Sequence, residues 1–393
     1  MQQRAIKVVF LADGNAKDVR LWSGTTSHIA NALEKQPEIE TYYINNVEKS
    51  RNYFTLIIGA IFSRVLRLFG KEYLCRWTLG TAKRFAKFIE KELTKLPKDI
   101  DVIFSIATTM SMAFLKTDAK KIYCSDGTFA CMINYYPCFF NLCNRTLREV
   151  NIIDKNAFEN CDLLLFPSDW AANSAINDYN INPSKVKVIP FGANIEKEYS
   201  DIEIQNIIKN RSSNKCNLLF IGVDWERKGG NIVLEIAKEL HSQNVNVHLD
   251  IVGIKNLSLP LPDYVTNHSF ISKKTEEGKN KMIKLFEEAH FFVLPTRQEC
   301  YGIVYAEASS FAVPSITTKT GGVETAVKDN INGMTFDLSD SPKKYADHIV
   351  NLFNNRAEYE KLCLSSFNDY KTRLNWNVAG EQMLEVIKEI IKK

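Results

Sequence analysis

Short apolar runs alternate with longer stretches of helical periodicity along most of the chain. Consecutive apolar residues that end at turn-forming residues are typical of strands buried in a parallel sheet. Strands that alternate with helices indicate a doubly wound α/β fold. The predicted strands are residues 6–11, 40–44, 102–106, 121–124, 162–166, 185–189, 218–221, 247–252, 265–271, 291–294, 315–317 and 334–336.

The alternation is interrupted once, by a charged segment that follows Phe191 and runs to Asn214. It begins afresh at Leu218, and 393 residues are long for one domain. We therefore expect two Rossmann-like domains that face a cleft. The predicted boundaries are 1–192 for the first domain and 193–374 for the second, with a terminal helix over 375–393 that crosses back to the first.

The most informative stretch is residues 290–314, which holds a predicted buried strand, a loop and a helix from Ile303 to Phe311. Glu299 lies in the loop after the strand, and Glu307 lies on the second turn of the helix. In open α/β sheets, ligands bind in the crevice at the carboxyl ends of the strands. The first N–H groups of the helix, at Gly302, Ile303 and Val304, are donors suited to a pyrophosphate. Two solvated acids are the alternative.

A second candidate anion site follows the predicted strand 218–221. Arg227 and Lys228 precede Gly229 and Gly230 at the start of a helix. A cation beside glycine N–H groups and a helix N-terminus suits phosphate. The order of Lys and Gly differs from a P-loop, and the alternative is a solvated charge cluster.

Two strand ends in the first domain carry similar candidates. Gly24 lies in a small-residue loop before a helix over 27–33, where its N–H group can face a ligand or simply complete a helix cap. Asp126 follows the strand 121–124, and it is either a ligand-contacting acid or a turn residue ahead of Gly127.

Positive charge is concentrated in one segment, residues 51–91, which has nine Lys or Arg and two acids. The pattern predicts a largely helical segment over 53–90, with Arg64, Arg67 and Lys71 beside an apolar face. Such a helix can lie on an anionic membrane surface. The alternative is a core helix with a solvated basic flank.

Composition excludes several classes of function. A net charge of +4 gives no indication of nucleic-acid binding. Nine cysteines without a CxxC pair favour a reducing compartment and predict no metal site. There is no GxGxxG fingerprint, which argues against a dehydrogenase. We expect no signal peptide and no membrane-spanning segment.

These motifs together resemble the retaining glycosyltransferases of family 4, which have the GT-B fold. The resemblance is strongest over residues 218–336. It rests on Arg227-Lys228-Gly229, on Glu299-x2-Gly302-x4-Glu307, and on the Gly321-Gly322-x-Glu324 motif that follows. The chain departs from the family at Val223, where the family usually has Arg, and at Ala312, where it often has Gly. Asp126 takes the strand end where many members have His.

The resemblance implies a nucleotide-sugar donor in the second domain, an acceptor in the first and no metal or other cofactor. Lys228 and Arg227 would stabilise the leaving diphosphate, Glu299 would bind the donor sugar, and Asp126 would contact the donor sugar or the acceptor. The remaining donor contacts are expected from a wider set of residues. These are Glu307 on the ribose, Gly302, Ile303 and Val304 on the pyrophosphate, Tyr301, Gly24, and Ser272 near the base.

The sequence thus predicts a cytoplasmic enzyme, peripheral on the inner membrane face, that moves a sugar from a UDP- or GDP-sugar to a glycan or lipid-linked acceptor. Cell-surface polysaccharide synthesis is the expected role. A nucleotide-sugar epimerase of the same fold is one alternative. The other is a non-catalytic subunit that binds a sugar or a protein partner.

Overall fold

A computed structural model describes residues 4–195, 197–257 and 259–392. The chain forms two compact units. Unit 1 comprises residues 1–190 and 379–393, and unit 2 comprises residues 191–378. The long helix α15 (Trp376–Lys392) begins in unit 2 and belongs to unit 1 over most of its length.

Unit 1 contains a six-stranded parallel sheet in the order β2-β1-β3-β4-β5-β6. The chain passes from β1 to β2 on one side of β1, whereas β3 lies on the other side. The point between β1 and β3 is therefore a topological switch point, and the loops that follow these two strands lie on either side of it. The strands are β1 (Ile6–Leu11), β2 (Ile39–Ile44), β3 (Val102–Ile106), β4 (Lys120–Cys124), β5 (Leu163–Phe166) and β6 (Val186–Val188).

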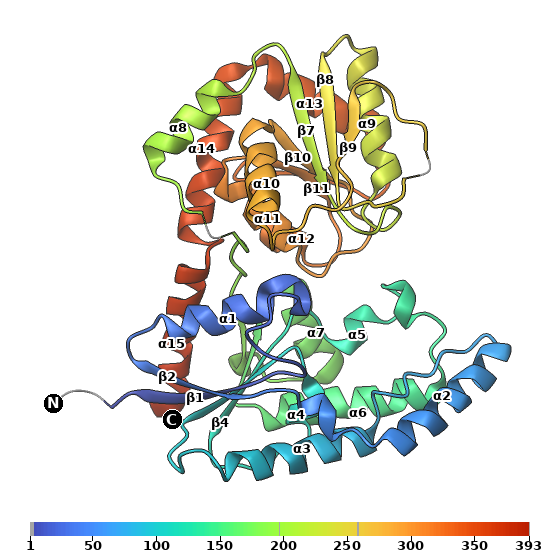
Figure 1. Cartoon of the computed structure of the whole chain (residues 1–393), viewed down its shortest axis with the longest axis vertical. Helices are drawn as coiled ribbons and strands as arrows, with labels where there is room; N and C mark the ends of the chain where they lie inside the picture. Colours follow the sequence, from blue (N-terminus) through green and yellow to red (C-terminus); the bar gives the residue numbers. More distant parts are fainter. Residues whose placement is uncertain (1–3, 196, 258, 393) are drawn as a thin grey trace. The chain divides into compact units, whose positions relative to one another are not determined.

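Helices cover both faces of this sheet (Figure 1). On one face, α1 and α15 are closely packed, since a Cβ added at Gly380 would lie 2.6 Å from the Ala32 carbonyl oxygen. On the other, buried residues of α3, α6 and α7 form one core with the sheet. The helices are α1 (Thr25–Glu34), α2 (Tyr53–Leu68), α3 (Leu79–Leu93), α4 (Thr109–Met112), α5 (Phe129–Met132), α6 (Asn144–Asn160) and α7 (Asp169–Tyr179), with 3-10 turns η1 (Leu21–Gly24), η2 (Val47–Ser50), η3 (Pro137–Phe139) and η4 (Pro183–Lys185).

Unit 2 repeats this architecture with the strand order β12-β11-β10-β7-β8-β9, again all parallel. Its switch point lies between β7 and β10. The strands are β7 (Cys216–Ile221), β8 (Val247–Val252), β9 (Val265–Asn267), β10 (Phe291–Leu294), β11 (Ser315–Thr318) and β12 (Gly333–Phe336). The predicted pair of doubly wound sheets is confirmed.

In unit 2, α9 packs on α13, while α11 and α8 pack on α14 (Figure 1). The sheet between them is buried, and Phe291, Phe292, Val293 and Leu294 of β10 are fully inaccessible to solvent. The helices are α8 (Asp201–Asn210), α9 (Gly230–Ser242), α10 (Glu276–Glu288), α11 (Ile303–Ser310), α12 (Val323–Ala326), α13 (Pro342–Asn354) and α14 (Arg356–Thr372).

The segment 53–90, predicted to be largely helical, contains two helices, α2 and α3, separated by residues 69–78. Trp77 lies in that connection rather than on a helix, whereas Phe85 is buried on α3. The charged segment that follows Phe191, which was expected to interrupt the alternation of strands and helices, contains the helix α8. Within the described residues, no helix is both long enough and apolar enough to span a membrane.

Candidate functional site

The strongest candidate site lies at the switch point of unit 2, where the loops after β7 and β10 meet. Lys228 comes from the first loop and Glu299 from the second, and their side chains form an ion pair. Both side chains are mostly buried, each with 12% of its surface exposed. Opposite charges held together with little water interact more strongly than exposed pairs do, so the pair fixes both loops.

The backbone around Gly229 brings the two loops into contact. Gly229 has φ +76° and caps the N-terminus of α9. A Cβ at this position would lie 2.0 Å from the Pro295 carbonyl oxygen at the end of β10. Only glycine combines this left-handed conformation with such a close approach. Gly229 therefore sets the position of Lys228 relative to the Glu299 loop.

Arg227 strengthens the same connection. Its guanidinium donates to the Gln298 carbonyl oxygen at 2.9 Å, and its own carbonyl oxygen accepts from the Arg297 N–H group at 2.7 Å. Its Nε lies 3.4 Å from the Asp224 carboxylate. Arg227 thus positions the loop that carries Glu299, in addition to placing a cation beside Lys228.

The start of α11 supplies N–H donors next to Glu299. Gly302 caps this helix with φ +83°, and a Cβ there would lie 2.3 Å from the Tyr305 ring. The N–H groups of Gly302, Ile303 and Val304 have no hydrogen-bond acceptor among the described residues. Free N–H groups at a helix start attract anions.

Glu307 contacts the loop that contains Ser272, the residue predicted to lie near the base of the donor nucleotide. The Lys273 ammonium donates to its carboxylate at 2.6 Å, and the Glu307 side chain is 4% exposed. Ser272 is the preceding residue, and its Oγ accepts from the Lys274 N–H group. The proposed ribose acid and the proposed base loop are therefore neighbours. Lys273 was missed because 34 residues separate it from Glu307.

Tyr301 differs from the other candidates in unit 2. Its side chain is 2% exposed, and its hydroxyl donates to the Phe191 carbonyl oxygen at 2.9 Å. Burial raises the pKa of this hydroxyl. The structure therefore places the Tyr301 side chain in the packing of unit 2.

In unit 1, Gly24 and Asp126 belong to neighbouring parts of one edge of the sheet. Gly24 has φ +87° and caps α1. Trp22 and Ser23 before it also have positive φ values, and the Trp22 indole donates to the Asp126 carboxylate at 3.2 Å. The structure thus joins the loop of Gly24 to Asp126 through Trp22.

Asp13 is a candidate that the sequence analysis missed. It follows β1 at the switch point of unit 1, and its Oδ1 is buried with no hydrogen-bond partner among the described residues. Burial raises the pKa of its carboxyl group, while the nearby Arg51 charge and a hydrogen bond from Thr108 oppose the rise. Its position directly after a buried strand could have suggested it.

The basic candidates Arg64, Arg67 and Lys71 lie on or just after α2, far along the chain from the strand ends. Arg67 forms an ion pair with Glu72 at 3.0 Å. Among the described residues, the side chains of Arg64 and Lys71 have no ion-pair or hydrogen-bond partner. Within the same described part of the chain, no three His, Cys, Asp or Glu residues are grouped as a metal site.

Known proteins resemble both the sequence and the structure. Residues 215–355 match the family described as "Glycosyl transferases group 1". The D-inositol 3-phosphate glycosyltransferase of Corynebacterium diphtheriae is 21% identical over 249 residues, which cover 60% of this chain and 58% of that protein. The chain thus spans less than two thirds of the length of this relative.

The structural similarity extends over nearly the whole chain. A sucrose-phosphate synthase from Thermosynechococcus elongatus superimposes with a TM-score of 0.66 at 14% identity, covering 98% of this chain and 99% of that one. The fold is GT-B. Anabaena HepE, solved in complex with UDP, has a TM-score of 0.64 at 14% identity over 98% of this chain and 100% of its own.

The family match falls on one of the two units. Residues 215–355 lie within unit 2 and include Lys228, Glu299 and Glu307. The predicted GT-B fold is confirmed, and the glycosyltransferase match falls on the unit whose switch point holds these residues.

Proposed function

We propose that this protein is a retaining glycosyltransferase that transfers a sugar from a UDP- or GDP-sugar to a glycan or lipid-linked acceptor in cell-surface polysaccharide synthesis. The observation that carries the proposal is the Lys228–Glu299 ion pair at the switch point of unit 2, next to the free N–H groups of α11. These groups bind the two parts of the donor that flank the bond to be broken.

Charge separation explains why this arrangement suits glycosyl transfer. When the bond between the sugar carbon and the diphosphate breaks, negative charge grows on the phosphate oxygens. Lys228 and the N–H groups of Ile303 and Val304 stabilise that charge, and preorganised donors of this kind contribute about 3 to 4 kcal/mol each. Glu299 accepts hydrogen bonds from the sugar hydroxyls and holds the sugar in place.

The acceptor oxygen then bonds to the sugar carbon on the face that the phosphate leaves. Its proton passes to the departing phosphate oxygen, and the configuration at the sugar carbon is retained. We propose that unit 1 binds the acceptor, with Asp126 and Asp13 as hydrogen-bond acceptors for its hydroxyls. Lys228 and the helix N–H groups stabilise the negative charge on the phosphate in place of a metal ion. We therefore expect turnover to be unchanged by the chelator EDTA.

Glu307 and the loop that contains Ser272 would bind the nucleoside. A carboxylate can accept hydrogen bonds from both ribose hydroxyls. Lys273 holds Glu307 in the absence of donor, and the resulting position beside the base loop suits a nucleoside. HepE, which shares the fold, has been solved with UDP and with UDP and glucose.

A ligand panel tests the donor. UDP or GDP should raise the melting temperature, and ADP and CMP should not, because a ligand that binds the folded state stabilises it by mass action. Lys228→Ala and Glu299→Ala should lose transfer and donor hydrolysis. Lys238→Ala, which removes an exposed lysine of α9, is the matched control. Unchanged turnover in the site variants would refute the assignment, and donor isomerisation without acceptor would indicate an epimerase.

We also propose that unit 1 binds the cytoplasmic face of a membrane through α2. Only Gly59 and Ser63 of this helix are buried. Its outward face is apolar, and Leu68 is 84% exposed. The other exposed apolar residues of α2 and its end are Tyr53, Phe54, Ile57, Ile58, Ile61, Phe62, Val65 and Phe69. An apolar patch of this extent beside basic residues is typical of an interfacial helix.

Vesicle sedimentation tests the membrane proposal. Leu68→Asp should reduce binding to anionic vesicles, because it places a charge in the inserted face. Ile202→Asp is the matched control, since Ile202 is a similarly exposed residue, at 72%, on α8 of unit 2. Equal binding of both variants and the parent protein would refute the role of α2.

A further inference from the structure

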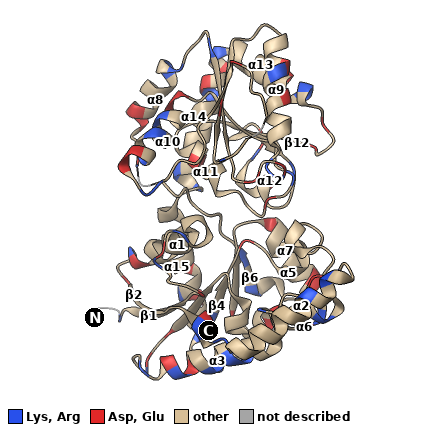
Figure 2. Cartoon of the chain, turned by 45° about the vertical axis from the view of Figure 1, so that its right-hand side comes forward, with Lys and Arg blue, Asp and Glu red and all other residues tan. Residues whose placement is uncertain are grey.

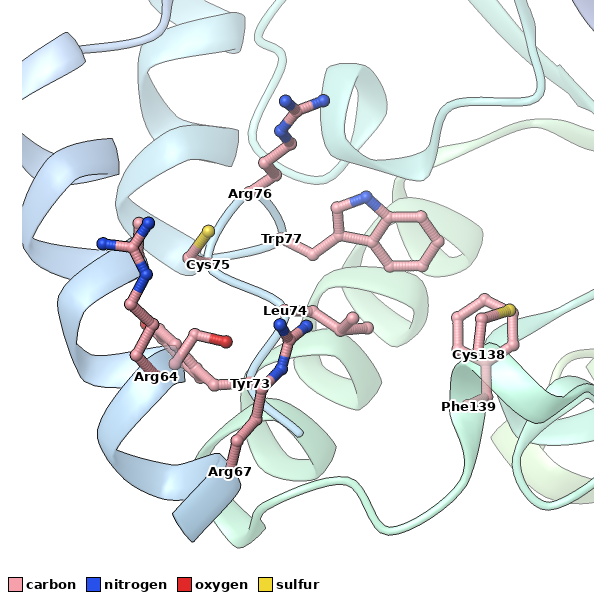
Figure 3. Close-up of a pocket in the computed structure, with 11 residues that line it drawn as sticks. Arg64, Arg67, Tyr73, Leu74, Cys75, Arg76, Trp77, Cys138 and Phe139 are labelled. Carbon is pink, nitrogen blue, oxygen red and sulfur yellow. The ribbon is translucent and has the colours of Figure 1, made fainter. Parts of the chain in front are cut away.

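A cavity of about 480 Å³ lies beside α2 in unit 1, and the predicted function does not use it. Its walls come from three segments: α2, residues 73–77 that follow it closely in sequence, and the distant η3 (Figure 3). The residues lining it are Ala60, Ser63, Arg64, Arg67, Tyr73, Leu74, Cys75, Arg76, Trp77, Cys138 and Phe139. Most of them are apolar or aromatic, the charged ones are all arginines, and none is an acid.

The apolar wall is built into the core and is therefore stable in shape. Trp77 packs against Phe139 with ring centroids 5.8 Å apart, and both pack on the buried cluster around Phe129. The Leu74 N–H group donates to the Thr146 hydroxyl of α6 at 3.1 Å. These contacts hold one side of the cavity against α5 and α6.

The opposite wall is α2, which approaches closely through small residues. A Cβ at Gly59 would lie 2.6 Å from the Cys75 Cβ, so the helix contacts residues 73–77 at this position. Phe62 packs edge-on against Tyr73 at 5.1 Å between ring centroids. The cavity thus opens beside a helix whose outward face is exposed and apolar.

Arginines provide the positive charge around the cavity. Figure 3 shows Arg64 and Arg67 on the α2 side and Arg76 on the connecting segment, with Leu74, Trp77 and Phe139 across from α2. Arg67 is partly neutralised by Glu72. Arg64 and Arg76 have no ion-pair partner within the described residues. Figure 2 shows further basic residues on α3.

We propose that this cavity binds the phosphate and the adjoining hydrocarbon of a membrane lipid. Guanidinium groups bind phosphate through several hydrogen bonds, and the apolar walls suit a chain rather than a sugar or a nucleotide. The proposal rests on the membrane role of α2 proposed above and adds a specific lipid site to it. A bulk anionic phospholipid and a lipid-linked acceptor share this chemistry.

Calorimetry with soluble probes tests the site without a membrane. Decyl phosphate below its critical micelle concentration should bind, whereas inorganic phosphate and decanol should bind at least about ten-fold more weakly, because each lacks one half of the ligand. Arg64→Gln with Arg76→Gln should weaken decyl phosphate binding by about ten-fold or more, as expected for lost hydrogen bonds to a charged group. Lys87→Gln with Lys91→Gln, an equal charge change at two exposed positions of α3, should not.

A size change tests the cavity separately from its charge. Ala60→Phe should fill the opening and abolish decyl phosphate binding, and Ala60→Ser should preserve it. Cys138 offers a second readout, because among the cysteines of the described chain it is the exposed one. Decyl phosphate should slow its alkylation by maleimide in the parent protein and not in Ala60→Phe.

Doped vesicles distinguish the two lipid sources. Phosphatidylcholine vesicles that contain phosphatidylglycerol test a bulk lipid, and those that contain polyprenyl phosphate test a lipid-linked acceptor. The site is supported when the parent protein binds vesicles that contain either dopant and the double arginine variant does not. Vesicle binding that is equal in parent and variant, together with no binding of decyl phosphate, would overturn it while leaving the membrane role of α2 intact.

Discussion

Replacing Gly229 by alanine should damage both the stability of unit 2 and its donor site. Two effects combine at this position. The backbone is left-handed, with φ +76°, and the new Cβ would lie 2.0 Å from the Pro295 carbonyl oxygen. That oxygen belongs to the backbone at the end of β10, so the clash cannot be relieved by rotating a side chain.

The two effects have separate magnitudes. A left-handed conformation costs a residue with a Cβ about 1 to 2 kcal/mol. Relieving the 2.0 Å contact requires the packed backbone to move by about 1 Å, and overpacked sites cost about 1 to 3 kcal/mol. The free energy of unfolding of unit 2 should fall by about 2 to 5 kcal/mol. For a unit of this size each kcal/mol lowers the melting temperature by about 2 to 4 °C, which gives about 4 to 20 °C.

Differential scanning calorimetry of the intact chain measures the loss, and Gly70→Ala is the matched control. Gly70 also has positive φ, at +66°, but nothing lies within 4 Å of an added Cβ. Its replacement should cost only the conformational part, about 1 to 2 kcal/mol. An equal loss in the two variants would show that the contact with Pro295 carries no energy and would refute the reasoning.

Donor binding provides an independent measurement on the same variant. Because Gly229 adjoins Lys228, a shift of this loop moves the ammonium away from Glu299 and from the diphosphate. The UDP affinity of Gly229→Ala should fall by about ten-fold or more at a temperature where the protein is still folded. Unchanged affinity would mean that Lys228 does not depend on this loop for its position.

Three further outcomes are expected. Lys228→Ala should lower kcat about 10²- to 10³-fold, with a smaller change in KM, since its charge matters most in the transition state. Glu307→Gln should weaken UDP binding by about ten-fold or more in calorimetry, because hydrogen bonds to a charged group are worth about 1.5 to 3 kcal/mol. Burial lowers the pKa of His290 from 6.5 to about 4, so its contribution to stability is complete above pH 6.5 and is lost as the pH falls toward 4. Urea unfolding should show a loss of about 3 kcal/mol over this range, and His290→Gln should reduce it.

The arrangement of strands could be predicted because it depends on local composition. Buried parallel strands are short apolar runs, and each predicted run corresponds to a strand of the structure. The helix α8 was missed because only Ile204 and Ile208 of its residues are buried. Its capping box, in which the Ser200 hydroxyl accepts from Glu203 N–H and the Glu203 carboxylate accepts from Ser200 N–H, was nevertheless visible in the sequence.

Site residues were predictable only where the fold determines their place. Lys228 and Glu299 follow neighbouring strands of one parallel sheet, so knowing the strands was enough to bring them together. The contact between Lys273 and Glu307 depends on how the loop before α10 folds over α11, which no short pattern encodes. Asp13 follows a strand and could have been predicted as a candidate from that position, but the burial of its carboxyl group appears only in the folded chain.

The helix α2 shows a more general limit. Its apolar periodicity is the same whether the apolar side faces a core or the solvent, so the sequence left both interpretations open. In the structure, most large apolar residues of α2 are exposed, and its small residues Gly59 and Ser63 are buried. Gly59 and Ser63 face the protein because their small size allows close packing on residues 73–77, whereas Ile57, Ile61 and Leu68 face outward. A helix that buries its small residues and exposes its large apolar ones indicates a partner outside the chain, and the arginines beside it favour an anionic one.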